Sequence, residues 1–158
     1  FPMMILAIAA VTFLGSSVPI LILVIGVLYI PGTARLVYNT TLSIKENDYV
    51  TAVRTIGAPN YRIILRHILP NTMAPLLIHI ALMLGFVIVT ESGLSFLGLG
   101  PQPPEPTWGQ MISVGRRYIN RQPWLLVSPM LILSIIILAY NLMGDALRDI
   151  LDPRLKKR

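Results

Sequence analysis

The chain has 158 residues, of which 54% are hydrophobic and only 13% are charged, and its formal net charge is +6. Soluble domains carry about 25% charged residues, so this composition argues against a soluble enzyme and indicates lipid as the solvent. The basic residues lie at the ends of apolar runs, as in membrane proteins, and not in a nucleic-acid-binding pattern. There is no cysteine, and the two histidines lie far apart, so we expect no metal site made by this chain alone.

Long uncharged runs locate the membrane spans. Residues 1–34, 67–90 and 122–144 contain no Asp, Glu, Lys or Arg, and a helix that crosses the hydrocarbon core needs roughly 20 apolar residues. The first run divides near Gly15, Ser16 and Ser17. We therefore predict an all-α, polytopic transmembrane helical bundle with apolar spans at about 2–14, 18–40, 71–92 and 123–144. Because Phe1 already lies inside an apolar run, we expect an N-terminal portion to precede it.

The distribution of basic residues predicts the topology. The segment 35–70, which begins at Arg35, and the tail 145–158 each hold five Lys or Arg, whereas the loop 91–122 holds three. The positive-inside rule then places a loop over 45–70 and the tail in the cytoplasm, and the loop 93–122 outside. Four prolines between positions 101 and 106 exclude regular helix from that part of the outer loop.

The sequence pattern of the cytoplasmic loop predicts two short amphipathic helices joined by a turn. Asn47 or Asp48 is suited to cap the first helix, whose apolar stripe is Tyr49, Val50, Val53 and Ile56.

Other residues of the loop predict the turn and the second helix. Gly57 is suited to the left-handed position after a helix, and Pro59 to the first turn of the next helix. Ile63, Ile64 and Ile68 form the stripe of the second helix, and Pro70 is expected to end it before the next span. The residues alone leave two interpretations open, which are a helix pair lying on anionic lipid and a docking site for a protein.

A resemblance favours the docking interpretation. The stretch from Asp48 to Gly57, followed by Arg66-His67-Ile68-Leu69-Pro70-Asn71, resembles the cytoplasmic signature loop of ATP-binding-cassette (ABC) importer permeases. That loop has a Glu-Ala-Ala triplet, a later glycine and a Leu-Pro pair. Here Thr51-Ala52-Val53 takes the place of the triplet, and only Ala52 is retained.

The resemblance extends over nearly the whole chain. It includes Leu94-Ser95-Phe96-Leu97-Gly98-Leu99-Gly100, Trp108-Gly109, Asn141 to Asp149, and Leu151-Asp152-Pro153-Arg154. These segments are similar to the second permease of the dipeptide, oligopeptide and nickel importers. The resemblance implies that residues 1–158 are part of one such transmembrane domain in the bacterial inner membrane.

The resemblance also implies the partners and the mechanism. They are a homologous permease, two cytoplasmic ATP-binding subunits and an extracytoplasmic solute-binding protein. ATP and Mg²⁺ would be bound by the ATPase subunits, because this chain has no phosphate-binding glycine loop, and the chain itself is expected to have no catalytic residue and no cofactor. The implied ATPase contacts are Tyr49, Thr51, Ala52, Val53, Arg54, Ile56, Gly57 and Ala58.

Two residues near the spans are candidates for a pathway or gate. Glu91 is the only acid near a span, and an ionisable group in a membrane is a functional candidate by default. The alternative is a solvated helix end. His79 lies deeper, where a histidine that bonds a neighbouring helix is the more common case.

The outer loop also has two interpretations. Trp108, Met111, Ile112, Gly115, Tyr118 and Ile119 repeat at helical spacing, which is typical of an interfacial helix. Alternatively, this helix is a platform on which Arg116, Arg117 and Arg121 contact the binding protein.

The transported solute is expected to be a short peptide. Nickel or a metal chelate is the alternative within the same architecture. A secondary transporter or channel is less favoured, because it would need coupling acids inside the spans and only Glu91 is available. A non-transporting membrane scaffold is the third interpretation.

Overall fold

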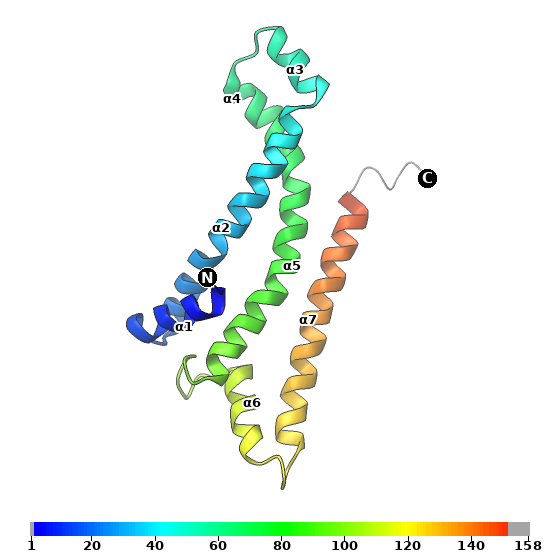
Figure 1. Ribbon diagram of the computed structural model, residues 1–158. Helices are drawn as coiled ribbons and strands as arrows, with labels where there is room; N and C mark the ends of the chain where they lie inside the picture. The colour runs from blue at the N-terminus through cyan, green and yellow to red at the C-terminus, as the bar shows by residue number, and fades with distance from the viewer. Residues whose placement is uncertain (1, 152–158) are drawn as a thin grey trace. The chain divides into compact units, whose positions relative to one another are not determined.

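The computed structural model describes residues 2–151, and every regular element in that range is helical (Figure 1). The elements are α1 (Met3–Leu14), α2 (Val18–Lys45), α3 (Asp48–Thr55), α4 (Asn60–Ile63), a π-helix η1 (Ile64–Ile68), α5 (Leu69–Phe96), α6 (Trp108–Arg117) and α7 (Trp124–Leu151). The all-α fold predicted from the composition is therefore confirmed. The last part of the predicted tail, residues 152–158, lies outside the described residues.

Three helices are long and apolar enough to cross a membrane. They are Val18–Lys45, the continuous helical stretch Asn60–Phe96, and Trp124–Leu151, while α1 is a shorter apolar helix. Each extends beyond the apolar run that predicted it. Helix α2 continues to Lys45 because Ile44, in its last turn, is buried, and α7 continues to Leu151 through Ala146, Leu147 and Arg148, which favour helix.

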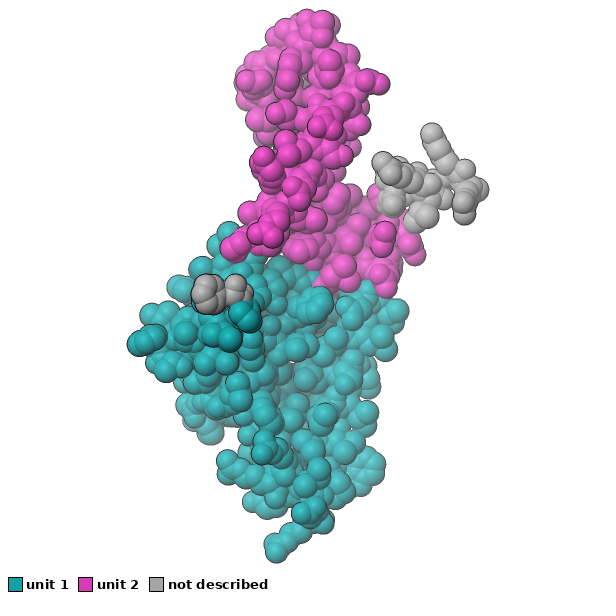
Figure 2. Space-filling model, viewed as in Figure 1, with its two compact units in different colours: residues 1–30, 83–142 teal, residues 31–82, 143–158 magenta. Residues whose placement is uncertain are grey.

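The chain divides into two compact units, shown in teal and magenta in Figure 2. Unit 1 comprises residues 1–30 and 83–142, and unit 2 comprises residues 31–82 and 143–158. Helices α2, α5 and α7 each contribute a part to both units, because they run past the unit boundaries at Pro31, Met83 and Met143.

The core of unit 1 joins α1, α2 and the end of α5. Its buried side chains are Ala7, Val11, Leu21, Val24, Ile25 and Leu94. Helix α1 ends before Gly15, whose φ of 100° is readily adopted only by glycine, so the division predicted at this point is confirmed. The chain reverses direction at this glycine, so that α2 runs back along α1. The small apolar face of α1 is thereby buried.

The segment after α5 packs tightly onto it. Gly98 has a φ of 83°, and the backbone N–H of Leu99 donates to the carbonyl of Leu94 at 2.9 Å, which closes the helix with a Schellman motif. Residues 101–106, where the four prolines lie, form no helix. Helix α6 then begins at Trp108, and the Thr107 hydroxyl caps it by accepting from the backbone N–H of Gln110 at 3.2 Å.

Two glycines of α6 bring it against its neighbours in unit 1. A Cβ at Gly109 would collide with the carbonyl oxygen of Ser92 and lie 2.6 Å from the backbone nitrogen of Phe96, both on α5. A Cβ at Gly115 would lie 2.5 Å from the carbonyl oxygen of Leu125 on α7. The helix predicted in the outer loop is therefore present, but it ends at Arg117, before Tyr118 and Ile119, and two of its glycines pack against α5 and α7.

We predict that Gly109→Ala destabilises unit 1 by about 1–3 kcal/mol, because the added methyl group meets backbone atoms that cannot rotate away. Gly32→Ala is the matched control, since Gly32 is also helical and has nothing within 4 Å of its ideal Cβ. Thermal unfolding in detergent measures both. Equal unfolding midpoints for the two variants would contradict the close packing of α6.

Candidate functional site

The segment between α2 and α5 folds into a compact hairpin of short helices. Helix α3 begins at Asp48, whose negative charge in the first turn suits the positive end of the helix dipole. Helix α4 follows the turn at 56–59, and Pro59 precedes its first residue with a φ of −69°. The two short helices predicted for this loop are therefore present, and Figure 1 shows α3 and α4 together at the ends of α2 and α5.

The turn after α3 is a complete Schellman motif. Gly57 has a φ of 81°, its N–H donates to the carbonyl of Arg54 at 3.0 Å, and the N–H of Ala58 donates to the carbonyl of Val53 at 3.3 Å. Val53 and Ala58 also pack against the same buried cluster, which is the apolar contact that accompanies this motif. The left-handed conformation predicted for Gly57 is confirmed, and it fixes the direction in which the chain leaves α3.

A small apolar cluster holds the hairpin together. It consists of Ile44 of α2, Val50 of α3, Ile63 of α4 and Ile68 of η1, and we call it the loop cluster. Each of the four elements contributes one buried side chain. The loop cluster therefore connects α3 directly to the two long helices that enter and leave the loop.

The π-helix is what brings two of these side chains together. Ile63 and Ile68 are five residues apart, and in a regular α-helix they would point about 140° apart. In η1 the N–H of Leu69 donates to the carbonyl of Ile64, five residues back, which is the π-helical pattern. The wider turn places Ile63 and Ile68 on one face, where Ile63 is only 2% exposed.

Two predictions for this region are wrong for the same reason. Ile64 was expected in the buried stripe at α-helical spacing, but the π-turn carries it outward and it is 50% exposed. Pro70 was expected to end the second helix, but α5 begins at Leu69 and continues through Pro70 to Phe96. A local π-turn accommodates the missing N–H of a proline within a membrane helix, and the Asn71 side chain donates to the carbonyl of His67 at 2.6 Å.

The predicted apolar stripe of α3 divides into two faces. Val50 is buried in the loop cluster and Val53 packs against it. Tyr49 and Ile56 lie on the other side and are 43% and 82% exposed. Ala52 is exposed between them, so Tyr49, Ala52 and Ile56 form an outward face at positions i, i+3 and i+7, which we call the α3 outer face.

The α3 outer face is held in place from one side. The rings of Tyr49 and His67 are 6.4 Å apart between centroids and tilted by 50°, so η1 supports the aromatic end of the face. Thr51, Arg54 and Gly57 are exposed around it, whereas Ala58 is half-buried. The residues predicted to contact an ATPase are thus mostly exposed, with Val53 and Ala58 turned toward the loop cluster.

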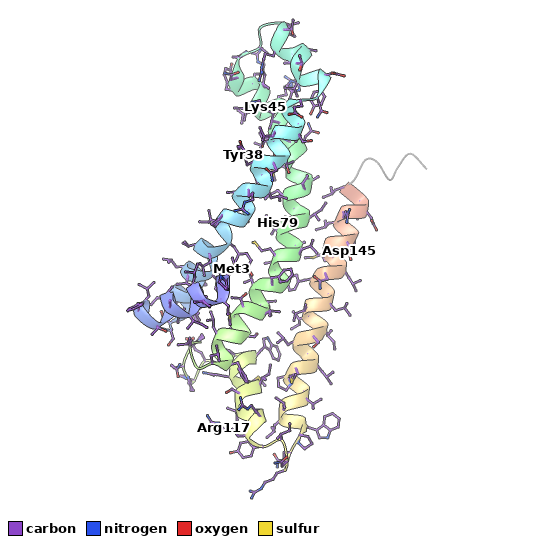
Figure 3. The ribbon with its side chains drawn as sticks, viewed as in Figure 1. Met3, Tyr38, Lys45, His79, Arg117 and Asp145 are labelled. Atoms are coloured by element: carbon purple, nitrogen blue, oxygen red, sulfur yellow. The ribbon has the colours of Figure 1, made fainter. Side chains whose placement is uncertain are left out.

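His79 lies between two long helices within unit 2. Its Nε2 atom is 3.3 Å from Oγ1 of Thr33 on α2, and Figure 3 shows His79 on α5. This contact matches the interpretation of His79 as a histidine that bonds a neighbouring helix.

Glu91 lies in unit 1, near the end of α5. It is half-buried and accepts a hydrogen bond of 2.5 Å from the buried hydroxyl of Ser95, one turn later. Gly109 of α6 packs against the same turn of α5. Glu91 is therefore part of a packed polar corner, and its role as a gate stays a prediction.

The three arginines of the outer loop differ in their surroundings. The guanidinium carbon of Arg116 lies 5.9 Å from the centre of the Phe96 ring, a cation–π contact to the end of α5. Arg117 and Arg121 are exposed, and Arg117 is labelled at the end of α6 in Figure 3. Arg121 also lines a shallow hollow of about 470 Å³ together with Gln122, Pro123, Trp124, Leu125 and Ser128. This hollow was not predicted, because no periodic pattern marks a turn between helices.

Arg35 was grouped with the cytoplasmic segment in the charge count, but it lies within α2, ten residues before its last residue. The span predicted over 18–40 already includes Arg35, and α2 continues five residues beyond the predicted end, to Lys45.

The described residues define a class of protein before any relative is considered. Residues 2–151 contain three membrane-length helices and no cluster of three or more metal-ligating side chains. Such a chain is a multi-pass membrane protein whose most elaborated polar structure is the hairpin between α2 and α5.

Comparison with known proteins gives the family. Residues 1–157 match the family described as the binding-protein-dependent transport system inner membrane component, and the chain belongs to that family. A putative peptide transport system permease protein of Brucella suis biovar 1 is 44% identical over 156 residues, covering 99% of this chain and 53% of that protein. A glutathione transport system permease protein of Escherichia coli O1:K1 / APEC is 42% identical over 156 residues, covering 99% and 52%. The chain spans about half the length of the curated relatives it matches.

We predict that Ile63→Ala opens the hairpin and that Ile64→Ala does not. Removing a buried isoleucine side chain costs about 2–5 kcal/mol, whereas Ile64 is half exposed. Trypsin cleavage after Arg54 in the membrane-embedded protein measures the opening, because cleavage reports the population of the open form. The π-turn would be refuted as the organising feature if the two neighbouring variants were cleaved at the same rate.

We predict that Gly57→Val loosens the end of α3 and that Gly57→Asn largely preserves it. There is space at Gly57, since nothing lies within 4 Å of its ideal Cβ, so the penalty is that of the left-handed backbone. That penalty is about 1–2 kcal/mol for an ordinary residue and smaller for asparagine. Amide hydrogen exchange of residues 53–58 measures the effect. Faster exchange in the asparagine variant than in the valine variant would contradict this account.

Proposed function

We propose that this chain forms half of the translocation pathway of an ABC importer and that its α3 outer face docks on a cytoplasmic ATPase subunit. The observation that carries the proposal is the division of α3 into a buried face and an exposed face. Val50 anchors the helix through the loop cluster, while Ile56, directly after the last residue of α3, is left 82% exposed. An exposed apolar side chain on an anchored helix suits a cleft on a partner protein.

The connection of α3 to the membrane helices supports a mechanical role. Ile44 lies in the last turn of α2, and η1 leads without interruption into α5. A displacement of α3 by a partner is therefore passed to two membrane-length helices through packed side chains, since a packed cluster resists deformation. ATP binding and hydrolysis take place in the partner, and this chain supplies the lever and the pathway.

The partners follow from the family and from the topology. The family description names a binding-protein-dependent system, so we propose an extracytoplasmic solute-binding protein on the side of α6, where Arg117 and Arg121 are exposed. A second, homologous permease completes the pathway, and two ATPase subunits bind at the loops of the two permeases.

The proposed solute is a short peptide. Two relatives are named for peptide transport and glutathione transport, and glutathione is itself a small peptide with free carboxylates. The described residues offer no metal-ligand cluster that would favour nickel.

The test compares substitutions of two exposed apolar residues in the same hairpin. We predict that Ile56→Ser lowers ATP-driven peptide uptake in proteoliposomes by about tenfold, the effect of losing roughly 1.4 kcal/mol of docking energy. Leu65→Ser is the matched control, because Leu65 is 61% exposed but lies on η1, away from the α3 outer face. Hydrolysis stimulated by the loaded binding protein should fall with uptake in the first variant only. Normal uptake by Ile56→Ser, or an equal loss in both variants, would exclude the α3 outer face as the docking surface.

A further inference from the structure

The last residues of α5, 91–96, contain a serine that is almost fully buried, and we call this stretch the α5 end turn. Ser95 is only 1% exposed, and its hydroxyl donates to Oε1 of Glu91 at 2.5 Å, at the short end of the range for O–H···O bonds. A buried hydroxyl without a partner costs free energy. Glu91 is therefore the group that makes the burial of Ser95 tolerable, and it selects one of the three staggered positions of the hydroxyl.

Two glycines bring the following chain directly against Ser95. A Cβ at Gly100 would collide with Oγ of Ser95, and a Cβ at Gly109 would lie 2.7 Å from the Cβ of Ser95. Both positions are closer than a real side chain can come, so the backbone at these two glycines runs along the Ser95 side chain with no space between them. The position of the Ser95 hydroxyl consequently determines how the backbone at both glycines lies on α5.

The segment that follows α5 is held together by side-chain hydrogen bonds of its own. The Gln102 amide donates to the carbonyls of Gly98 and Gly100 at 3.3 and 3.0 Å. The Gln110 amide donates to the carbonyl of Pro101 at 2.6 Å. The chain from Gly98 to Gln110, which we call the clamped segment, is therefore fixed within itself as well as to the α5 end turn.

The contacts of α6 with the α5 end turn can transmit a displacement. Gly109, in the first turn of α6, meets Ser95, and the guanidinium carbon of Arg116, in its last turn, lies 5.9 Å from the centre of the Phe96 ring. Figure 1 shows α6 next to the end of α5. Because closely packed groups resist deformation, α6 and the end of α5 move together as long as Ser95 stays in place.

The partners of Glu91 indicate a positioning role and not an ion pair. Its Oε1 accepts from Ser95, and its Oε2 lies 3.5 Å from the hydroxyl oxygen of Ser92, so both hydroxyls belong to its own helix. In the part of the chain that the structure describes, no Lys, Arg or His forms an ion pair with Glu91. A hydrogen-bond acceptor is therefore what this position needs, and an amide oxygen would also supply it.

We propose that Glu91 is a positioning residue which, through Ser95, locks the clamped segment to α5, so that contact of the solute-binding protein with α6 reaches the ATPase through α5. The helical stretch that ends at Phe96 begins at Asn60 and carries Ile63 and Ile68 of the loop cluster. One continuous helical stretch thus leads from the clamped segment to the hairpin. This inference rests on the proposed function and adds the residue pair on which stimulation by the binding protein depends.

The test measures ATP hydrolysis by the assembled transporter in proteoliposomes at increasing concentrations of peptide-loaded binding protein. Glu91→Leu removes the acceptor, Ser95→Ala removes the donor, and Glu91→Gln keeps an acceptor without the charge. Thr90→Val is the matched control. The Thr90 hydroxyl belongs to the residue next to Glu91, but it bonds the carbonyl of Phe86 at 2.8 Å and the hydroxyl of Tyr29 at 3.3 Å.

Glu91→Leu and Ser95→Ala should lower the maximal stimulation by about fivefold or more, the lower end of the usual range for coupling between two sites. The half-saturating concentration of binding protein should change by less than about twofold, because α6 still presents its docking side. Hydrolysis without binding protein should not change. Glu91→Gln and Thr90→Val should keep at least about half of the stimulation, because the bond between positions 91 and 95 survives. Combining Glu91→Leu with Ser95→Ala should be no worse than either alone, because the two side chains act as one unit.

Two results would overturn the positioning role. If Glu91→Gln is as impaired as Glu91→Leu, the charge is required and not the hydrogen bond. If the half-saturating concentration rises while the maximum is unchanged, the loss lies in docking and not in transmission. Copurification with the ATPase subunits verifies that each variant assembles, and if Glu91→Leu does not assemble, Ser95→Ala carries the same expectation.

The same assay separates this inference from the proposed function. If hydrolysis by the unmodified transporter does not respond to the loaded binding protein, the proposed function fails. If it responds and Ser95→Ala responds equally well, only the role of Glu91 and Ser95 fails.

Discussion

The functional part of this chain depends on one interaction, which is the packing of four buried aliphatic side chains in the loop cluster. Helix α3 has only eight residues, and an isolated helix of that length is marginal in water. Its stability comes from Val50, which packs against Ile44, Ile63 and Ile68. Because those partners belong to the helices on both sides of the loop, the contact that stabilises α3 also connects it to the membrane spans.

The π-helix reconciles two demands that a regular helix cannot meet together. The loop cluster needs Ile63 and Ile68 on one face, and the chain must continue into α5 past Pro70. One wider turn rotates Ile68 into line with Ile63, and it lies directly before the proline whose N–H is missing. Asn71 and Thr72 donate side-chain hydrogen bonds to the carbonyls of His67 and Leu69, which offsets the irregularity locally. The loop and the span are consequently one continuous helical piece and not two pieces with a break.

The elements that could be predicted are those with a strong local cause. Hydrophobicity and length predict the long helices, and a left-handed glycine after an amphipathic stripe predicts the turn at Gly57. The failure at Ile64 comes from assuming a constant period of 3.6 residues, and the failure at Pro70 from expecting a proline to end a helix. A π-turn is set by tertiary packing and leaves no pattern of its own. The sequence predicts which residues of α3 are apolar, but not which of them face the loop cluster, because its apolar stripe includes both the buried and the exposed side chains. Which side faces inward depends on Ile44 and Ile63, which lie in other elements.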